Sequence, residues 1–259
     1  MSWHTTKAYS FARRLARSLG ITKFIVNLRP QRDYEARFSE LMTELVRPGF
    51  VIWDIGANRG YYTKILSKLV KSEGKVYAIE PSPKNISVLQ QAVYEIDNVK
   101  LIEGALSDEI GLITFLEDKG KGTTSRIVDA NFKPTTGQNL TTVPVMTGDT
   151  LTIEKKCTFP DLIKIDTEGF ELEVISGMSE TLKNKQLKAV CIEVHFRRLD
   201  ERGLDHAPRE IENRLKRAGF SVNWCDPSHI IATRGLSRQK PPDISGKTTS
   251  TGLSFQKNE

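Results

Sequence analysis

The sequence has few cysteines and no long apolar run. Only three of its 259 residues are cysteine, Cys157, Cys191 and Cys225, and no two are spaced as Cys-x-x-Cys. Their odd number and wide spacing exclude a disulfide framework and disfavour a zinc knuckle. No stretch approaches 18 consecutive apolar residues, so we expect no membrane-spanning helix. A reducing compartment fits this cysteine usage, and we expect a soluble cytoplasmic protein.

Acidic residues are missing from residues 1–32, which contain seven basic residues. Residues 234–259 contain five basic and two acidic residues, so a net charge of −4 remains on 33–233 although the whole chain carries +6. Enzymes that act on nucleic acid usually place positive charge around the active cleft. The position of the basic residues at the two ends therefore disfavours a nucleic-acid partner.

The segment 8–19 has the pattern of an amphipathic helix, with apolar residues on one face and three arginines between them. Three interpretations stay open. The helix packs against the rest of the protein, it contacts an anionic membrane surface peripherally, or it is a mitochondrial targeting peptide. It lacks the apolar core of a secretory signal. Peripheral contact would place the protein at the inner membrane surface.

Composition and periodicity divide the chain into three parts. We expect a basic helical extension over 1–46, an α/β catalytic domain over 47–234 and a flexible basic tail over 235–259. A second helix at 35–46 is expected to end the extension, because a Pro-Gly pair follows it. Hydrophobic residues make up 38% of the chain, which is enough for a core.

Strands and helices alternate through the middle part. We expect strands at 51–55, 75–79, 99–102, 112–116, 141–146, 162–166, 189–195, 220–224 and 229–233, and helices at 61–71, 83–97, 171–183 and 208–218. This alternation predicts a mainly parallel sheet covered by helices on both faces. The intervening segment 118–142 is expected to be a long loop that covers the acceptor.

Polar residues stand where several of these strands end. Asp54, Glu80, Asp166 and His195 come from four different strands. Ligands of parallel α/β sheets bind beyond the carboxyl ends of the strands, at the point where the strand order reverses. We therefore expect these four side chains to gather along one rim of the sheet.

The first strand–helix turn favours S-adenosylmethionine as the ligand. Gly56 and Gly60 allow a tight turn, and Glu80 can accept hydrogen bonds from ribose hydroxyls. A dinucleotide site requires the pattern G-x-G-x-x-G, whereas this turn reads D-x-G-x-x-x-G. Asp54 would repel a pyrophosphate but suits the cationic amino-acid end of S-adenosylmethionine. An NAD-dependent reductase remains the alternative from another class of enzyme.

Three segments resemble the FkbM-like family of S-adenosylmethionine-dependent methyltransferases. They are VIWDIGANRGYY at 51–62, AIEPSP at 78–83 and LIKIDTEGFE at 162–171. The resemblance covers roughly residues 45–200 in the same order and spacing. It implies the class I methyltransferase fold, a Rossmann-like seven-stranded sheet whose last two strands form an antiparallel hairpin. It also implies O-methylation of a hydroxyl on a sugar, glycolipid or natural product.

The resemblance assigns residues to the cofactor. Those expected along its methionine side are Asp54, Gly56, Asn58 and Gly60. Glu80 is expected to hold the ribose, and Ala105, Ser107 and Asp108 are expected beside the adenine. The family motif fixes neither the catalytic base nor the acceptor, so an RNA acceptor also stays open as an alternative.

A hydroxyl acceptor is a poor nucleophile near neutral pH, so a nearby base helps the transfer. The candidates are Asp166, Glu168, Glu193 and His195, with Asp166, His195 and Glu168 assigned as catalytic residues. His195 is attractive because histidine titrates in the useful range. The same four side chains are compatible with Mg²⁺, but no ligand spacing demands it and no metal ligand is assigned.

Overall fold

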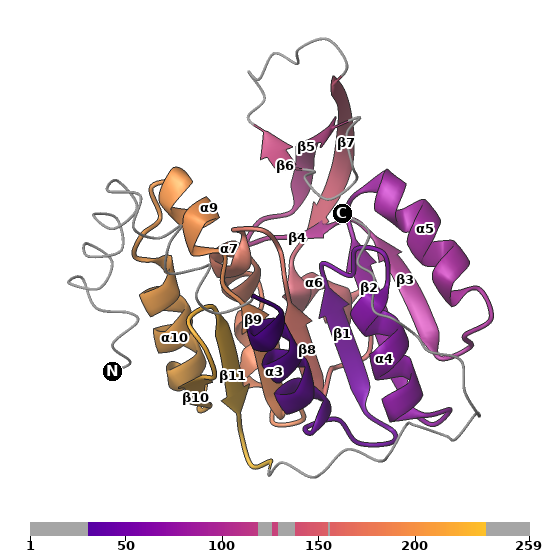
Figure 1. Cartoon of the computed structure of the whole chain (residues 1–259), viewed down its shortest axis with the longest axis vertical. Helices are drawn as coiled ribbons and strands as arrows, with labels where there is room; N and C mark the ends of the chain where they lie inside the picture. The colour runs from indigo at the N-terminus through magenta and orange to yellow at the C-terminus, as the bar shows by residue number, and fades with distance from the viewer. Residues whose placement is uncertain (1–30, 119–125, 129–137, 155, 237–259) are drawn as a thin grey trace.

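The computed structural model describes residues 31–118, 126–128, 138–154 and 156–236 (Figure 1). Its helices are α3 (Gln31–Thr43), α4 (Tyr61–Val70), α5 (Pro83–Val93), α6 (Gly148–Ile153), α7 (Glu171–Ser176), α8 (Ser179–Lys183), α9 (Phe196–Glu201) and α10 (Ala207–Arg217). Its strands are β1 (Val51–Ile55), β2 (Lys75–Glu80), β3 (Val99–Glu103), β4 (Ala105–Leu106), β5 (Gly111–Asp118), β6 (Arg126–Val128), β7 (Gln138–Met146), β8 (Leu162–Ile165), β9 (Ala189–Glu193), β10 (Ser221–Trp224) and β11 (His229–Thr233).

The larger sheet has seven strands in the order β10-β11-β9-β8-β1-β2-β3. All of its pairings are parallel except those of β11, which runs antiparallel to both β9 and β10. The expected mainly parallel sheet with an antiparallel C-terminal hairpin is confirmed. From β1 the chain adds β2 and β3 on one side of the sheet, and from β8 it adds the later strands on the other side. The strand order therefore reverses between β1 and β8.

Side chains alternate across the sheet and create two apolar layers. Trp53 and Ile55 of β1 belong to a buried cluster that contains residues of α6, α7, α8 and α10. Ile52 of the same strand belongs to the opposite cluster, with residues of α3 and α4. Burial on both faces is expected for a parallel sheet, because its crossover helices cover both sides.

A second sheet follows β3 and has the order β4-β7-β5-β6. It projects from the edge at which β1 and β8 end (Figure 1). The prediction of a single loop over 118–142 is wrong for its described part. Strand β6 lies within this segment, and β7 begins at Gln138, which pairs with Asp118 of β5. Residues 119–125 and 129–137 lie outside the described residues.

The predicted helix at 171–183 is two helices, α7 and α8, separated at Gly177 and Met178. A Cβ on Gly177 would lie 2.0 Å from the backbone oxygen of Ser107, so two backbones meet there. The sequence patterns also missed α6 and α9. The expected helix at 8–19 and most of the tail, from residue 237, lie outside the described residues. Among the described helices, none has the length and apolarity needed to cross a membrane.

We expect the α4 face of the sheet to contribute strongly to stability. Leu66 of α4 is fully buried, whereas Leu112 of β5 is 73% exposed. Leu66→Ala should lower the free energy of unfolding by about 2–5 kcal/mol, because it leaves a cavity in the core. Leu112→Ala is the matched control and should change that energy by only about 0.5 kcal/mol. Urea denaturation measures both, and equal effects would contradict this assignment of the core.

Candidate active site

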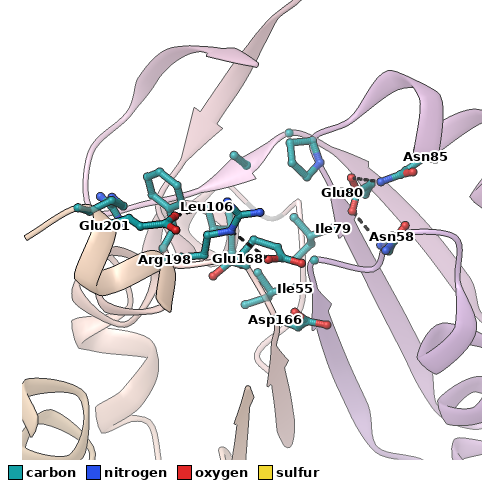
Figure 2. Close-up of a pocket in the computed structure, with 17 residues that line it drawn as sticks. Ile55, Asn58, Ile79, Glu80, Asn85, Leu106, Asp166, Glu168, Arg198 and Glu201 are labelled. Carbon is teal, nitrogen blue, oxygen red and sulfur yellow. Dashed lines mark hydrogen bonds and ion pairs between the residues drawn. The ribbon is translucent and has the colours of Figure 1, made fainter. Parts of the chain in front are cut away.

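A cavity of about 370 Å³ opens beyond the carboxyl ends of β1, β2 and β8 (Figure 2). Its walls come from these strand ends, from β4 and from α9. The lining residues that bear on its chemistry are Gly56, Asn58, Glu80, Asp166, Glu168 and Arg198. This is the place that strand topology predicts for a ligand, next to the reversal of strand order.

The turn between β1 and α4 approaches β8 closely at Gly56. Gly56 has a φ of 75°, and a Cβ there would lie 1.8 Å from the backbone oxygen of Asp166. Only glycine fits this position, because both the conformation and the space exclude a side chain. Gly60, expected beside the cofactor, does not line the cavity; a Cβ there would lie 2.6 Å from Leu89.

Glu80 stands at the end of β2 with its carboxylate fixed by the turn around it. One oxygen accepts a hydrogen bond from the backbone N–H of Asn58 at 2.8 Å. The other accepts from the N–H of Ser82 at 3.0 Å and from the side chain of Asn85 at 3.2 Å. Burial raises the pKa of Glu80, and these hydrogen bonds oppose the rise. The side chain is therefore an oriented hydrogen-bond acceptor in the cavity wall.

Asp54, expected along the methionine side of the cofactor, does not line the cavity. The reason is strand alternation, which directs Asp54 toward α4. Its fully buried carboxylate accepts a hydrogen bond from Thr63 at 2.7 Å and lies 3.2 Å from the amine of Lys164. Lys164 also lies 3.4 Å from Asp166 and donates to the backbone oxygen of Gly56 at 3.1 Å.

The charge of Lys164 is stabilised by its surroundings. Burial alone would lower the pKa of this amine, but the two carboxylates outweigh burial and raise the pKa. Lys164 therefore acts as a fixed buried cation between β1 and the end of β8. The sequence signal for it was a lysine inside an otherwise apolar strand, Leu162–Ile165.

Of the three residues expected beside the adenine, Ala105 lines the cavity, whereas Ser107 and Asp108 do not. The chain turns away after β4 because the backbone N–H of Ser107 bonds to Met146 at 3.0 Å and its carbonyl packs against Gly177. The Ser107 hydroxyl donates to Asp108 at 3.0 Å. Pairing of β4 with β7 thus determines which residues of this segment reach the cavity.

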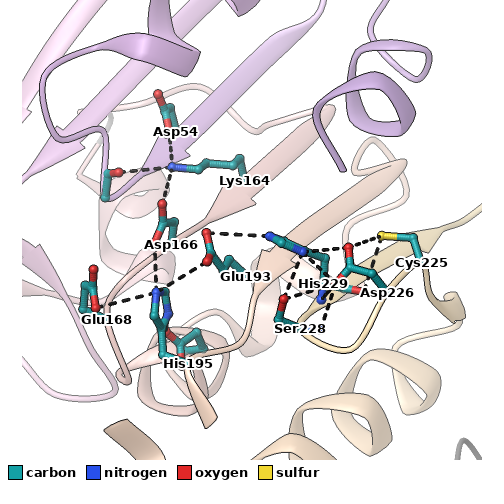
Figure 3. Close-up of polar contacts among 12 residues, drawn as sticks. Asp54, Lys164, Asp166, Glu168, Glu193, His195, Cys225, Asp226, Ser228 and His229 are labelled. Atoms are coloured by element: carbon teal, nitrogen blue, oxygen red, sulfur yellow. Dashed lines mark hydrogen bonds and ion pairs between the residues drawn. The ribbon is translucent and has the colours of Figure 1, made fainter. Parts of the chain in front are cut away.

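Carboxylates gather around His195 at the ends of β8 and β9 (Figure 3). The Nε2 atom of His195 lies 3.6 Å from Asp166, 3.6 Å from Glu168 and 3.8 Å from Glu193. These four residues are the predicted base candidates, and the structure brings all four together. Asp166 and Glu168 line the cavity.

A buried carboxylate that sequence reasoning missed orients the imidazole. Nδ1 of His195 lies 2.9 Å from Glu171, which is fully buried and also accepts the N–H of Gly169 at 2.8 Å. Burial alone would lower the pKa of His195. The hydrogen bond and charge of Glu171, helped by the nearby carboxylates, raise it to about 10 instead. This direction favours the protonated imidazole, so His195 is less suited to accept a proton than the ordinary pKa of histidine suggests.

Glu193 has a second histidine behind it. Its Oε2 lies 3.7 Å from Nε2 of His229, whose Nδ1 lies 2.8 Å from Asp226. Burial would raise the pKa of Glu193, but His229 and His195 lower it. His229 is buried and stacks on Phe38 at 4.3 Å between ring centroids. No sequence pattern linked residues 193 and 229, because the contact depends on the antiparallel pairing of β9 with β11.

Glu168 is the most accessible carboxylate of the group, with a side chain that is 53% exposed. Its backbone φ of 53° places it in a tight turn after β8. Burial of its carboxyl raises the pKa, and the charge of His195 opposes the rise. For Asp166, burial also raises the pKa, and Lys164 lowers it. Carboxylates with raised pKa values beside a cavity are suited to accept a proton.

Comparison with known proteins gives one family and several relatives. A profile described as the methyltransferase FkbM domain matches residues 54–222. The hexuronic acid methyltransferase AglP of Haloferax volcanii is 26% identical over 183 residues, 70% of this chain and 68% of the relative. The 31-O-demethyl-FK506 methyltransferase FkbM of Streptomyces tacrolimicus is 28% identical over 204 residues, 68% of this chain and 75% of the relative.

Among solved structures, the methyltransferase FkbM from Methylobacillus flagellatus KT matches 76% of this chain with a TM-score of 0.49 and 16% identity. The matched part spans 50% of that protein.

The buried pair of Asp54 and Lys164 yields a stability prediction. Lys164→Met should lower the free energy of unfolding by about 3–5 kcal/mol, because it leaves buried carboxylates without their cation. The double variant Asp54→Asn with Lys164→Met should recover part of this loss. Lys183→Met, at an exposed lysine, is the control and should be nearly neutral. Urea denaturation checks all three, and a neutral Lys164→Met would refute the role of this cation.

Proposed function

Because the chain belongs to the FkbM methyltransferase family, we propose that it transfers a methyl group from S-adenosylmethionine to a hydroxyl of a sugar, glycolipid or natural product. The observation that carries this proposal is the composition of one cavity. Glu80, a fixed hydrogen-bond acceptor, lines it at the end of β2, and Asp166 and Glu168 line it after β8. One space thus contains a hydrogen-bond acceptor suited to a ribose hydroxyl, together with candidate bases.

The cavity fits the cofactor in size and chemistry. Its volume of about 370 Å³ lies in the range of small-molecule sites. Glu80 uses part of its acceptor capacity on Asn58, Ser82 and Asn85, and an ionised carboxylate has about four lone-pair positions. The remainder is available to a ribose hydroxyl. Gly56 and Asn58 contribute the wall next to Glu80, and Ala105 contributes the wall from β4.

The acceptor is proposed to lie against the carboxylates after β8. Ionised carboxylates accept hydrogen bonds and donate none, so they suit a partner rich in hydroxyl donors. The two relatives are named for a hexuronic acid and for 31-O-demethyl-FK506, and these names favour a sugar or natural-product acceptor.

The proposed step needs a base and correct alignment. When bound, S-adenosylmethionine supplies the methyl group: its S–CH₃ bond breaks as the O–CH₃ bond forms, and the sulfur keeps the electron pair. The hydroxyl proton passes to Glu168, which is exposed to the cavity and has a raised pKa. Asp166 is held by Lys164 and positions the acceptor. His195, fixed through Nδ1 by the buried Glu171, orients these carboxylates rather than taking the proton.

Cofactor binding is tested at Glu80. Glu80→Ala should weaken binding of S-adenosylhomocysteine by roughly 10- to 100-fold, because a charged hydrogen-bond acceptor is lost. Glu103→Ala is the matched control, since Glu103 ends the neighbouring strand in register with Glu80 but is exposed. Calorimetry measures both. Tight binding of NADH by the wild type, with no response to S-adenosylhomocysteine, would overturn the proposed function in favour of a reductase.

The acceptor class is tested by transfer of label. The protein is incubated with methyl-labelled S-adenosylmethionine and cell extract, and the products are fractionated. We expect the label in glycan, lipid or small-molecule fractions, as an ether stable to mild base. Label that appears only in nucleic acid or protein would contradict the proposed acceptor.

The role of Glu168 is tested with the acceptor isolated in this way. Glu168→Gln should lower the single-turnover rate by about 10²- to 10⁴-fold, because the amide cannot take the hydroxyl proton. Its affinity for S-adenosylhomocysteine should stay unchanged. Glu201→Gln is the comparison, because it alters another cavity-lining carboxylate, at the last residue of α9. A wild-type rate in Glu168→Gln would clear this residue of the role.

A further inference from the structure

Nε2 of His195 faces three carboxylates and forms no hydrogen bond with any of them. Their oxygens lie 3.6, 3.6 and 3.8 Å from Nε2, which is longer than a hydrogen bond. One ligand atom each from Asp166, Glu193 and His195 can be chosen so that all three lie within 4.8 Å of one another. Adjacent and opposite ligands of a six-coordinate ion with bonds of about 2.1 Å lie about 3.0 and 4.2 Å apart. The spacings from Nε2 to Asp166 and Glu193, 3.6 and 3.8 Å, fall between these two values.

Asp166, Glu193 and His195 each have a buried partner. This partner holds the side-chain polar atom that does not face the other two residues. Glu171, fully buried, lies at Nδ1 of His195, so that Nε2 faces the carboxylates. Lys164, 2% exposed, lies at Oδ2 of Asp166, so that Oδ1 faces His195. Such outer partners orient the ligands of metal sites and fix the histidine tautomer.

Glu193 is held in the same manner by His229, which lies near Oε2 and leaves Oε1 toward His195. His229 is 4% exposed, and its Nε2 atom, directed at Glu193, has no hydrogen-bond partner among the described residues. Oε2 of the fully buried Glu171 likewise has none in the described part of the chain. Glu193 and His195 are thus firmly positioned by buried partners on the side away from each other.

We propose that Asp166, Glu193 and His195 bind one divalent metal ion at the acceptor end of the cavity. Two carboxylates and one imidazole suit Mn²⁺ and also accommodate Mg²⁺. Binding requires His195 to release its proton, and that proton goes to solvent. Glu168, next to the three ligands, stays free to act as the base.

The role of the ion in the reaction rests on the proposed function. A metal at this position lies beside Asp166, which lines the cavity. It would coordinate the acceptor hydroxyl, lower the pKa of that hydroxyl and orient a neighbouring oxygen of the acceptor. The ligand set therefore predicts an acceptor that presents two adjacent oxygens, such as a vicinal diol.

The test measures Mn²⁺ itself, without turnover. The full-length protein is treated with EDTA, dialysed and titrated with Mn²⁺, and free Mn²⁺ is followed by electron paramagnetic resonance. We expect one saturable site per chain, displaced by excess Mg²⁺. Asp166→Asn and Glu193→Gln should each weaken binding by about tenfold or more, whereas Glu180→Gln, at an exposed carboxylate on α8, should not change it.

A spectroscopic measurement on the wild type covers the case in which a ligand variant fails to fold. Bound Mn²⁺ should show ¹⁴N modulation from the imidazole of His195 in a spin-echo experiment. No saturable site, equal binding in all variants, or a site without ¹⁴N modulation would overturn the proposal.

Binding of S-adenosylhomocysteine, measured on the same samples, separates this proposal from the proposed function. Cofactor binding and methyl transfer that persist fully in EDTA would refute the metal while the methyltransferase stands. Mn²⁺ binding without any cofactor binding would refute the proposed function while the metal site stands.

Discussion

The position of one buried amine determines much of this site. Lys164 lies between Asp54 on β1 and Asp166 after β8, and it also donates to the backbone of the glycine turn at Gly56. It thereby joins the two strands at which the strand order reverses. Without it, Asp54 would be an unpaired buried charge, and the backbone oxygen of Gly56 and the carboxylate of Asp166 would lose the partner they share.

Local sequence patterns predict the larger sheet well because its signals are strong. Short apolar runs such as Val51–Ile55 and Leu162–Ile165 are buried on both faces, and amphipathic helices separate them. The patterns fail where contacts between distant segments determine where a helix or strand begins and ends. The break between α7 and α8 at Gly177 arises from the close approach of Ser107, and the pairing of β5 with β7 extends strands that composition alone describes as a loop.

The residues of the candidate site also include some that the sequence predicts and some that it does not. Asp166 and Glu80 could be predicted, because each follows or ends a recognisable strand and topology brings such ends together. Asp54 belongs to an equally clear motif, but the alternation of the strand directs it under α4. The partners Glu171 and His229 could not be assigned, since each becomes relevant only through a residue that is 24 or more positions away in the chain.

The balance of charge constrains how the site can work. A sulfonium near several free carboxylates would be stabilised more in the ground state than in the transition state, in which its charge disperses, and the transfer would slow. An oxygen that becomes negative would also be repelled by them. Lys164 lies at Asp166 and His229 lies at Glu193. Their positive charges reduce both the stabilisation of the sulfonium and the repulsion of the oxygen. In the proposed transfer, Glu168, which is half exposed, would be the carboxylate that takes the proton.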